Sequence, residues 1–426
     1  MDPLSHYNLE TVLINQMQRF KNSKPGIKRR INFLQYVNHP QIIVITGVRR
    51  CGKSTLLRQL ADFFPSYLYV NLDDERFAGI GIHHLTEIMT IFEENQPGIR
   101  TIFFLDEIQN IPEWERFVRR IHDDGYQVFL TGSNAQLLSS ELGTRLTGRY
   151  VTISLWPFRF DEYSNIMGVS EFPQGTEAEA EIQRLFIRYL EEGGFPGFLQ
   201  YQDPEILHQI FEDIIYRDII VRYGIREILP FRELCRYIYS NLTREASYQS
   251  LAKSIGVKNA MTIRSWIGYL QDSFLISECF RFDYSLRRQH AYHKKMYGID
   301  TGLRNTVSFR FSGDTGMLFE QAVWMEYKSR GYDLFWFKAE GECDFLVFDS
   351  GKIITCIQAC TELTLENQER EVSGLLKAMK EMRCDDGVIL TLRQYQEMVI
   401  EGMRIKIRPL WNVILTDSPL IQKSKW

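Results

Sequence analysis

The 426-residue sequence has few of the features that mark secreted and membrane proteins. Its seven cysteines are scattered, with no CxxC pair and no Cys/His cluster at zinc-binding spacing. An odd and dispersed set of cysteines is typical of reduced thiols in the cytoplasm. The first residues carry an early acid and lack the apolar core of a signal peptide, and no apolar run is long enough to cross a bilayer. We therefore expect a soluble, cytoplasmic protein without a membrane partner.

The sequence also lacks a large excess of charge of either sign. Its 50 lysines and arginines and 54 aspartates and glutamates leave a formal net charge of −4. This balance argues against a protein that coats nucleic acid over its whole surface, although it is compatible with a local basic patch. The length and the hydrophobic content of 44% predict two to four globular domains.

The first third of the chain alternates short apolar runs with amphipathic segments. The apolar runs are QIIVITG, SYLYVNL, RTIFFLDE, YQVFLTGSN and RYVTISL. Continuous apolar runs separated by helical patterns are typical of parallel strands that are covered on both faces. We predict an α/β domain with a parallel sheet that ends near Leu155. Helical periodicity follows from Asp161 to about Arg222.

The segment after the first apolar run matches the pattern G-x-x-x-x-G-K-[ST] of a phosphate-binding loop. Glycines allow backbone N–H groups to wrap phosphate oxygens, and the N-terminus of the next helix adds its positive dipole end. We expect Lys53 to reach the β- and γ-phosphates and the Ser54 hydroxyl to bind Mg²⁺. The predicted ATP-binding residues are Gly47, Val48, Arg49, Arg50, Cys51, Gly52, Lys53, Ser54 and Thr55.

The run TIFFLDE supplies the second half of the predicted nucleotide site. Its apolar residues carry Asp106 to a strand end, where the carboxylate can hold Mg²⁺. Glu107 comes next and is placed to polarise the attacking water as a catalytic residue. The following strand ends in TGSN, where Asn134 or Ser133 would orient the water, although such residues also make ordinary turns. A base-reading NKxD motif is missing, which favours ATP over GTP.

These motifs occur together with LWPFRFDEY and EEGGFPGF, and the set resembles the prokaryotic AAA+ ATPases with a C-terminal domain of unknown function. The resemblance spans essentially the whole chain. It implies an AAA+ sheet domain of the ASCE type in residues 1–155 and a helical lid in 156–230. It further implies a winged helix in 231–312 and an α/β restriction-endonuclease-like domain in 313–426.

The resemblance also points to an arginine after the fourth strand. In the family this position is held by the arginine of LTGRY, here Arg149, and Arg145 lies one helical turn earlier. An arginine at a γ-phosphate stabilises the charge of the transition state, so Arg149 is a predicted catalytic residue. The alternative is a surface arginine that pairs with Asp161 or Glu162.

DNA is a predicted partner of the winged-helix segment. Arg264 lies on its presumed recognition helix, and beyond it tyrosines alternate with four cations: Arg287, Arg288, Lys294 and Lys295. Cations can neutralise phosphates, and aromatic rings can stack on bases. The alternative is a lid or relay in which the cations lie on a solvated strand edge and discourage pairing with another strand.

The last third contains ECDFLVFDSGKIITCIQAC, which predicts an acidic strand, a Ser-Gly turn and a second strand. By resemblance, Glu320, Asp344 and Gln358 stand where restriction-endonuclease-like domains hold a metal ion. Cys360 takes the place of the usual lysine, and the nearest spare lysine is Lys338 on the preceding strand. Because nuclease chemistry needs that lysine, we expect a degenerate site in a domain that binds a partner protein.

The sequence therefore predicts Mg²⁺-dependent ATP hydrolysis that drives a conformational switch, coupled to the winged helix and the C-terminal domain. Two alternatives stay open. One is an ATP-gated DNA-binding protein or nuclease, and the other is a signalling ATPase with slow turnover. Rings, dimers and monomers are all compatible with the sequence.

Overall fold

The structure is a computed structural model, and it describes residues 6–95, 101–133, 146–169, 175–308 and 315–416. The chain forms two compact units, residues 1–155 and residues 156–426. Among the described residues, no helix combines the length and the apolar character that a membrane span requires.

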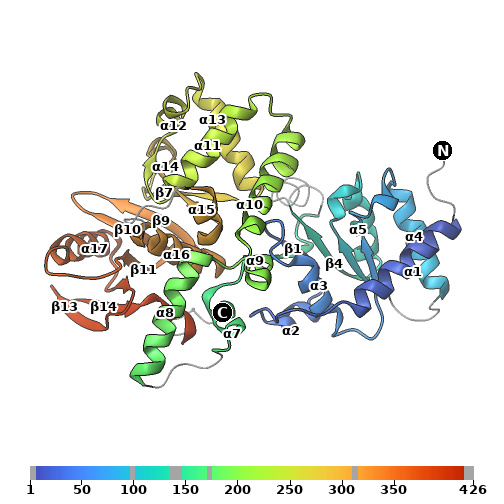
Figure 1. Ribbon diagram of the computed structural model, residues 1–426, viewed down its shortest axis with the longest axis horizontal. Helices are drawn as coiled ribbons and strands as arrows, with labels where there is room; N and C mark the ends of the chain where they lie inside the picture. Colours follow the sequence, from blue (N-terminus) through green and yellow to red (C-terminus); the bar gives the residue numbers. More distant parts are fainter. Residues whose placement is uncertain (1–5, 96–100, 134–145, 170–174, 309–314, 417–426) are drawn as a thin grey trace. The chain divides into compact units, whose positions relative to one another are not determined.

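In the part of the chain that the structure describes, the first unit is built around a parallel sheet of five strands in the order β2-β3-β4-β1-β5 (Figure 1). The strands are β1 (Ile42–Thr46), β2 (Leu68–Asn71), β3 (Ile102–Asp106), β4 (Gln127–Gly132) and β5 (Tyr150–Ser154). Every residue of β1 is buried, because this strand lies between β4 and β5 and the sheet is covered on both faces. The prediction of a parallel α/β sheet is confirmed.

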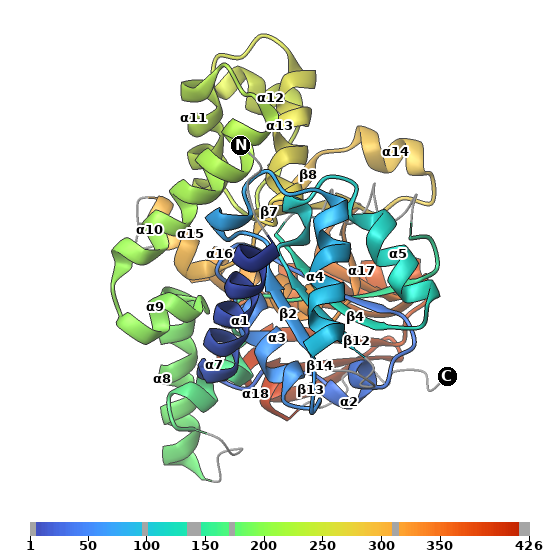
Figure 2. The same cartoon turned by 90° about the vertical axis from the view of Figure 1, so that its right-hand side faces the viewer.

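Helices cover the two faces of this sheet (Figures 1 and 2). The helical elements are α1 (His6–Asn22), α2 (Phe33–Val37), α3 (Lys53–Ala61), η1 (Glu75–Phe77), α4 (Ile82–Asn95), η2 (Ile108–Asn110) and α5 (Trp114–Asp123). Apolar residues of α4 and α5 share one core with alternate strand residues such as Val70 and Leu105. Helix α3 packs over β3 and β4 on the other face, where the rings of Phe104 and Phe129 stack with centroids 4.8 Å apart.

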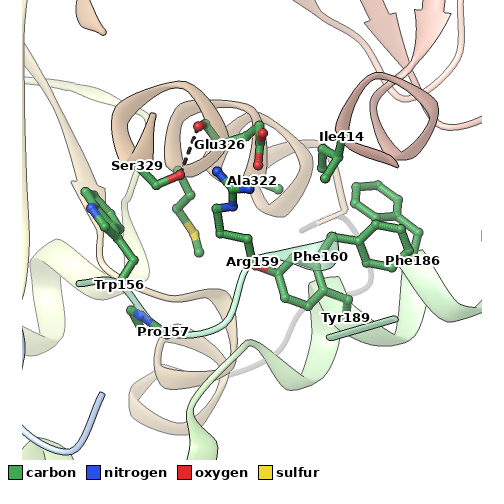
Figure 3. A pocket seen from close by; sticks show the side chains of 11 residues that line it. Trp156, Pro157, Arg159, Phe160, Phe186, Tyr189, Ala322, Glu326, Ser329 and Ile414 are labelled. Carbon is green, nitrogen blue, oxygen red and sulfur yellow. Dashed lines mark hydrogen bonds between the residues drawn. The ribbon is translucent and has the colours of Figure 1, made fainter. Parts of the chain in front are cut away.

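The second unit begins with helices, as the periodicity predicts. They are α7 (Phe160–Ile166), α8 (Thr176–Glu192), α9 (Pro196–Tyr201), α10 (Pro204–Asp213) and the π-helix η4 (Ile214–Val221). Around Trp156 and Arg159, the WPFRF segment lines a cavity of about 10 Å³ (Figure 3). That volume suits a single water molecule, so the side chains of this segment nearly fill the space between the elements that they contact.

The same unit contains a mixed sheet, which has nine strands among the described residues, in the order β13-β14-β12-β11-β10-β9-β7-β8-β6. The strands are β6 (Glu245–Ala246), β7 (Ile276–Arg281), β8 (Lys294–Gly298), β9 (Asp333–Lys338), β10 (Glu342–Asp349), β11 (Lys352–Ala359), β12 (Asp386–Thr391), β13 (Gln396–Ile400) and β14 (Met403–Pro409). Strand β7 pairs in parallel with β9. The segments expected to form separate winged-helix and C-terminal domains therefore share one sheet.

Further helices accompany this sheet (Figure 1). They are α11 (Ile228–Ser240), α12 (Tyr248–Ser254), α13 (Ala260–Asp272), α14 (Leu286–Ala291), α15 (Thr301–Val307), α16 (Thr315–Ser329), α17 (Gln368–Met382) and α18 (Leu410–Leu415). Helix α17 packs on β10, β11 and β12 and buries Leu375 and Met379 in their core.

A buried aspartate at the start of α15 holds the glycine pair that separates α8 from α9. Asp300 Oδ2 accepts a hydrogen bond from the N–H of Gly194 at 2.7 Å, and Oδ1 accepts one from the N–H of Leu303 at 2.8 Å. A Cβ atom at Gly193 would lie 2.2 Å from Asp300 Oδ1. Burial raises the pKa of Asp300 to about 6. The Gly193-Gly194 pair therefore ends α8 and also makes a tertiary contact with Asp300.

We expect Gly193→Ala to destabilise the second unit more than Gly175→Ala does. Both glycines have positive φ, 72° and 97°, so both changes cost about 1 kcal/mol or more in backbone strain. At Gly193 the new methyl group also overlaps the Asp300 carboxylate, which adds about 1–3 kcal/mol. At Gly175 no atom lies within 4 Å of the added Cβ atom.

Denaturant unfolding followed by tryptophan fluorescence measures this difference, because every tryptophan except Trp114 lies in the second unit. Equal losses of stability in the two variants would show that the contact with Asp300 contributes nothing.

Candidate nucleotide-binding site

The predicted phosphate-binding loop connects β1 to α3. Gly47 has φ 148°, and a Cβ atom there would lie 2.1 Å from the carbonyl oxygen of Leu155. Gly52 has φ 101° and is the N-cap residue of α3. Both positions therefore require glycine, the first for close approach and the second for its backbone conformation. Val48 and Cys51 are buried, so these side chains anchor the loop beneath its backbone.

The Lys53 side chain folds back over this loop. Its Nζ donates hydrogen bonds to the carbonyl oxygens of Gly47 and Val48 at 3.1 and 3.2 Å, and it lies 4.0 Å from Glu107 Oε1. Lys53 is only 5% exposed. A buried ammonium group that is held by carbonyl oxygens at a helix N-terminus is positioned to bind a phosphate group.

Asp106 ends β3 with its carboxylate buried at 2% exposure. Its Oδ2 accepts a hydrogen bond from the hydroxyl of Tyr69 at 3.0 Å, and its Oδ1 accepts one from the hydroxyl of Thr131. Burial raises the pKa of Asp106, while the hydrogen bonds from Thr131, Ser54 and Tyr69 oppose the shift. Ser54 and Asp106, the two predicted Mg²⁺ ligands, are thus in contact. A hydroxyl and a carboxylate oxygen fit the preference of Mg²⁺ for oxygen ligands.

Glu107 takes a left-handed backbone conformation, with φ 55°, directly after the strand. Its N–H donates a hydrogen bond to Thr131 Oγ1 at 2.9 Å, and its carboxylate accepts one from Gln109 Nε2. The Thr131 hydroxyl therefore joins the backbone of Glu107 to the carboxylate of Asp106.

Sequence reasoning missed Tyr69, Gln109 and Thr131. The threonine stands in the TGSN stretch that reads as an ordinary turn, and only the pairing of β3 with β4 brings it beside Asp106. Tyr69 lies in the middle of an apolar run, where the sequence offers no signal for a polar role.

The structure brings together only some of the predicted residues. Ser133 is buried just after β4, whereas Asn134 and Arg145 lie outside the described residues.

Arg149 lies at the amino end of the strands, opposite the end where the phosphate-binding loop begins. Its carbonyl oxygen accepts a hydrogen bond from the N–H of Ile42, and its Nε donates one to Asp123 Oδ1 at 3.1 Å. The five residues of β1 span roughly 13 Å, so this side chain does not reach the loop of its own chain. A role at a γ-phosphate stays a prediction that would require a neighbouring copy.

A cavity of about 350 Å³ opens beside Ser54, between α1 and α3. Its lining residues include the cations Arg19, Lys24 and Arg58. On the same side of α3, Gln59 Nε2 donates hydrogen bonds to the carbonyl oxygens of Pro25 and Ile27 at 2.7 Å each. The segment before β1 is therefore fixed against the helix that begins at the phosphate-binding loop.

The residues predicted as a second metal site have a lysine among them. Lys295 Nζ, from β8, lies 3.2 Å from Glu320 Oε1 on α16 and 3.3 Å from Asp344 Oδ1 on β10. Gln358 lies beside Asp344, because its Oε1 accepts a hydrogen bond from the N–H of Asp344 at 3.3 Å, while its Nε2 donates one to Glu371 Oε2 at 2.6 Å. In the described part of the chain, no three His, Cys, Asp or Glu side chains are grouped to hold a metal ion.

The predicted basic run is only partly on the surface. Lys294 and Lys295 are both buried, and Lys294 Nζ donates hydrogen bonds to the carbonyl oxygens of His290 and Tyr292. Arg287 and Arg288 are exposed. Of the four cations that were predicted to contact DNA, the two arginines are therefore exposed and the two lysines are buried in the protein. The spare lysine, Lys338, donates its hydrogen bond to Glu245 and not to Glu320 or Asp344.

Comparisons with known proteins agree with the geometry of the first unit. Residues 39–164 match the family model of an AAA domain, and residues 183–314 match that of a domain of unknown function. The second match thus precedes the segment 313–426, where the resemblance had implied such a domain.

Two relatives match most of the chain. The sequence is 31% identical to the uncharacterized protein MJ1544 of Methanocaldococcus jannaschii over 96% of this chain and 95% of that protein. It is 26% identical to an uncharacterized protein of Haemophilus influenzae over 87% of this chain and 94% of that one. Among solved structures, the Walker-type ATPase PABY2304 of Pyrococcus abyssi aligns with a TM-score of 0.43 at 14% identity, covering 68% of this chain and 99% of that chain.

Proposed function

The chain belongs to the family of P-loop ATPases with an AAA domain, and we propose that it binds ATP with Mg²⁺ at the phosphate-binding loop and hydrolyses the bond between the β- and γ-phosphates to give ADP and phosphate. One observation carries the proposal. Lys53, Ser54, Asp106 and Glu107 come from two separate segments and meet at the carboxyl end of one parallel sheet. That edge is where open α/β sheets bind their ligands.

In the proposed complex, phosphate oxygens replace the present partners of Lys53. Its ammonium group leaves the carbonyl oxygens of Gly47 and Val48 and pairs with the β- and γ-phosphates. Ser54 and Asp106 would hold Mg²⁺, which neutralises charge on the phosphates when it is bound. Glu107 then orients a water molecule and accepts its proton. Gln109 holds the Glu107 carboxylate in place until that step.

We expect Glu107→Gln to bind ATP normally and to hydrolyse it about 10²- to 10⁴-fold more slowly, because the amide cannot accept the proton of the water. Lys53→Ala should lose both ATP hydrolysis and ATP binding. Steady-state phosphate release and binding of a fluorescent ATP analogue measure the two effects.

Glu113→Gln is the matched control, because Glu113 lies six residues further on and its exposed carboxylate pairs with Arg116. The proposed role of Glu107 is wrong if Glu107→Gln and Glu113→Gln turn over ATP at the same rate.

Thr131→Val should reduce ATP turnover by about ten- to a hundredfold. The substitution keeps the shape but removes the hydroxyl that joins Asp106 to the Glu107 backbone, a loss of about 1–3 kcal/mol. Thr131→Ser should restore most of the turnover. Thr152→Val, at an exposed position on β5, should leave the rate unchanged. Full turnover in Thr131→Val would show that the hydroxyl does not position the site.

The connectivity of the second unit supports two finer proposals. The order α11, β6, α12, α13, β7, α14, β8, with β8 paired antiparallel to both β6 and β7, supports the proposal of a winged helix. The order α16, β9, β10, β11, α17, β12, with antiparallel pairs followed by one parallel pair, supports the proposal of a restriction-endonuclease-like core. We propose that this unit converts the nucleotide state into binding of a partner protein, as a conformational switch.

DNA binding is a second candidate function, favoured by the exposed part of the segment between β7 and β8. Tyr284 is 78% exposed there, and Arg287 and Arg288 are exposed on α14. Exposed arginines beside an aromatic ring suit a phosphate backbone with stackable bases.

If this segment binds DNA, the double variant Arg287→Ala/Arg288→Ala weakens duplex binding at least tenfold and lowers its salt dependence. Fluorescence anisotropy at 50 and 200 mM salt measures both effects. Arg404→Ala, which removes an exposed arginine from β14, is the control. Equal affinity of the double variant and the parent would reject the candidate.

A further inference from the structure

The carboxylates of the C-terminal segment surround one buried ammonium group. Lys295 Nζ lies 2.8 Å from Glu342 Oε1, 3.2 Å from Glu320 Oε1 and 3.3 Å from Asp344 Oδ1. Lys295 is 4% exposed. Lys295 thus contributes the central group of a buried cluster whose three carboxylates come from α16 and β10.

Two further hydrogen-bond donors contact the same carboxylates, and an aromatic ring lies close to the ammonium group. The hydroxyl of Tyr297 donates a hydrogen bond to the same Glu320 oxygen at 2.7 Å, and the N–H of Ala359 donates one to Asp344 Oδ2 at 2.9 Å. The Trp336 ring centroid lies 5.7 Å from Lys295 Nζ, within the range of a cation–π contact. Tyr297 therefore shares the Glu320 oxygen with Lys295, and Ala359 satisfies the Asp344 oxygen that Lys295 leaves unused.

We propose that the Lys295 ammonium group takes the place of a divalent metal ion among Glu320, Glu342 and Asp344. The site carries its cation on the chain itself and takes up no metal. This inference goes beyond ATP hydrolysis and uses no residue of the first unit.

The position of Lys295 in the sequence gives this substitution a mechanical consequence. Lys295 belongs to β8, within residues 183–314, whereas its partners lie on α16 and β10. With a freely exchanging metal ion, the contact between β8 and these carboxylates would be lost whenever the ion leaves. A covalently attached ammonium group keeps β8 and the carboxylates together at all metal concentrations, because a buried charge that loses its partners is strongly unfavourable.

The test is Mn²⁺ binding to the full-length, nucleotide-free chain, measured by the loss of the free Mn²⁺ electron paramagnetic resonance signal. The wild-type chain and Asp344→Asn should give the same isotherm. Lys295→Ala should gain about one Mn²⁺ per chain with an affinity at least tenfold above the wild-type background, because three carboxylates then lack their cation. Lys295→Ala/Asp344→Asn should lose that gain.

Lys294→Ala is the matched control for Lys295→Ala. Lys294 is equally buried on the same strand, but its ammonium group is held by backbone carbonyl oxygens. We expect this variant to gain no Mn²⁺. The unfolding midpoint of Lys295→Ala should fall by about 5–10 °C and recover in millimolar Mn²⁺, whereas that of Lys294→Ala should not recover.

Two results would overturn the proposal. One is Mn²⁺ binding by the wild-type chain that Asp344→Asn removes, and this result is available even if Lys295→Ala does not fold. The other is a folded Lys295→Ala variant that gains no Mn²⁺. Mn²⁺ bound at the phosphate-binding loop does not depend on Asp344, so failure of the ATPase proposal leaves this comparison intact.

Discussion

The first unit depends on how hydrogen bonds satisfy one buried carboxyl group, that of Asp106. A charged group with 2% exposure is costly unless hydrogen bonds or a cation offset its desolvation. Hydroxyl groups from β2, α3 and β4 supply that compensation through Tyr69, Ser54 and Thr131. Because these groups converge on one carboxylate, the ends of the strands and the start of α3 are held in a single geometry. The candidate site lies at this carboxyl group, where a ligand could replace one of the hydroxyl partners.

The second unit also buries ionisable groups that need partners, but here the carboxylates pair with a lysine. Lys295 brings a positive charge into the interior, and three carboxylates from α16 and β10 surround it. In the first unit the buried acid contacts neutral hydroxyl groups, which are ligands that a metal ion can share. In the second unit the acids already have a cation that belongs to the chain. The two clusters thus differ in what surrounds the buried acid, which is hydroxyl groups around Asp106 and a lysine ammonium group beside Asp344.

Local sequence patterns were sufficient for much of the nucleotide site. The spacing of Gly47, Gly52, Lys53 and Ser54 predicts a strand, a loop and a helix, and these elements form as expected because each requirement lies within a few neighbouring residues. The apolar runs likewise predict a parallel sheet. Residues that act across strands were harder to find. Thr131 looks like a turn residue, and its role depends on the register of β4 against β3.

The sequence by itself determined the residue types that handle phosphate and the parallel sheet that carries them, because both follow from short-range spacing and hydrophobic periodicity. It did not determine the environment of the lysines in the later segments. Lys294 and Lys295 read as part of a surface run, but both are buried on β8, and the acids that pair with Lys295 lie 25 to 49 residues further along the chain. Only the tertiary structure decided this point, because burial and charge pairing depend on which distant strands and helices come together.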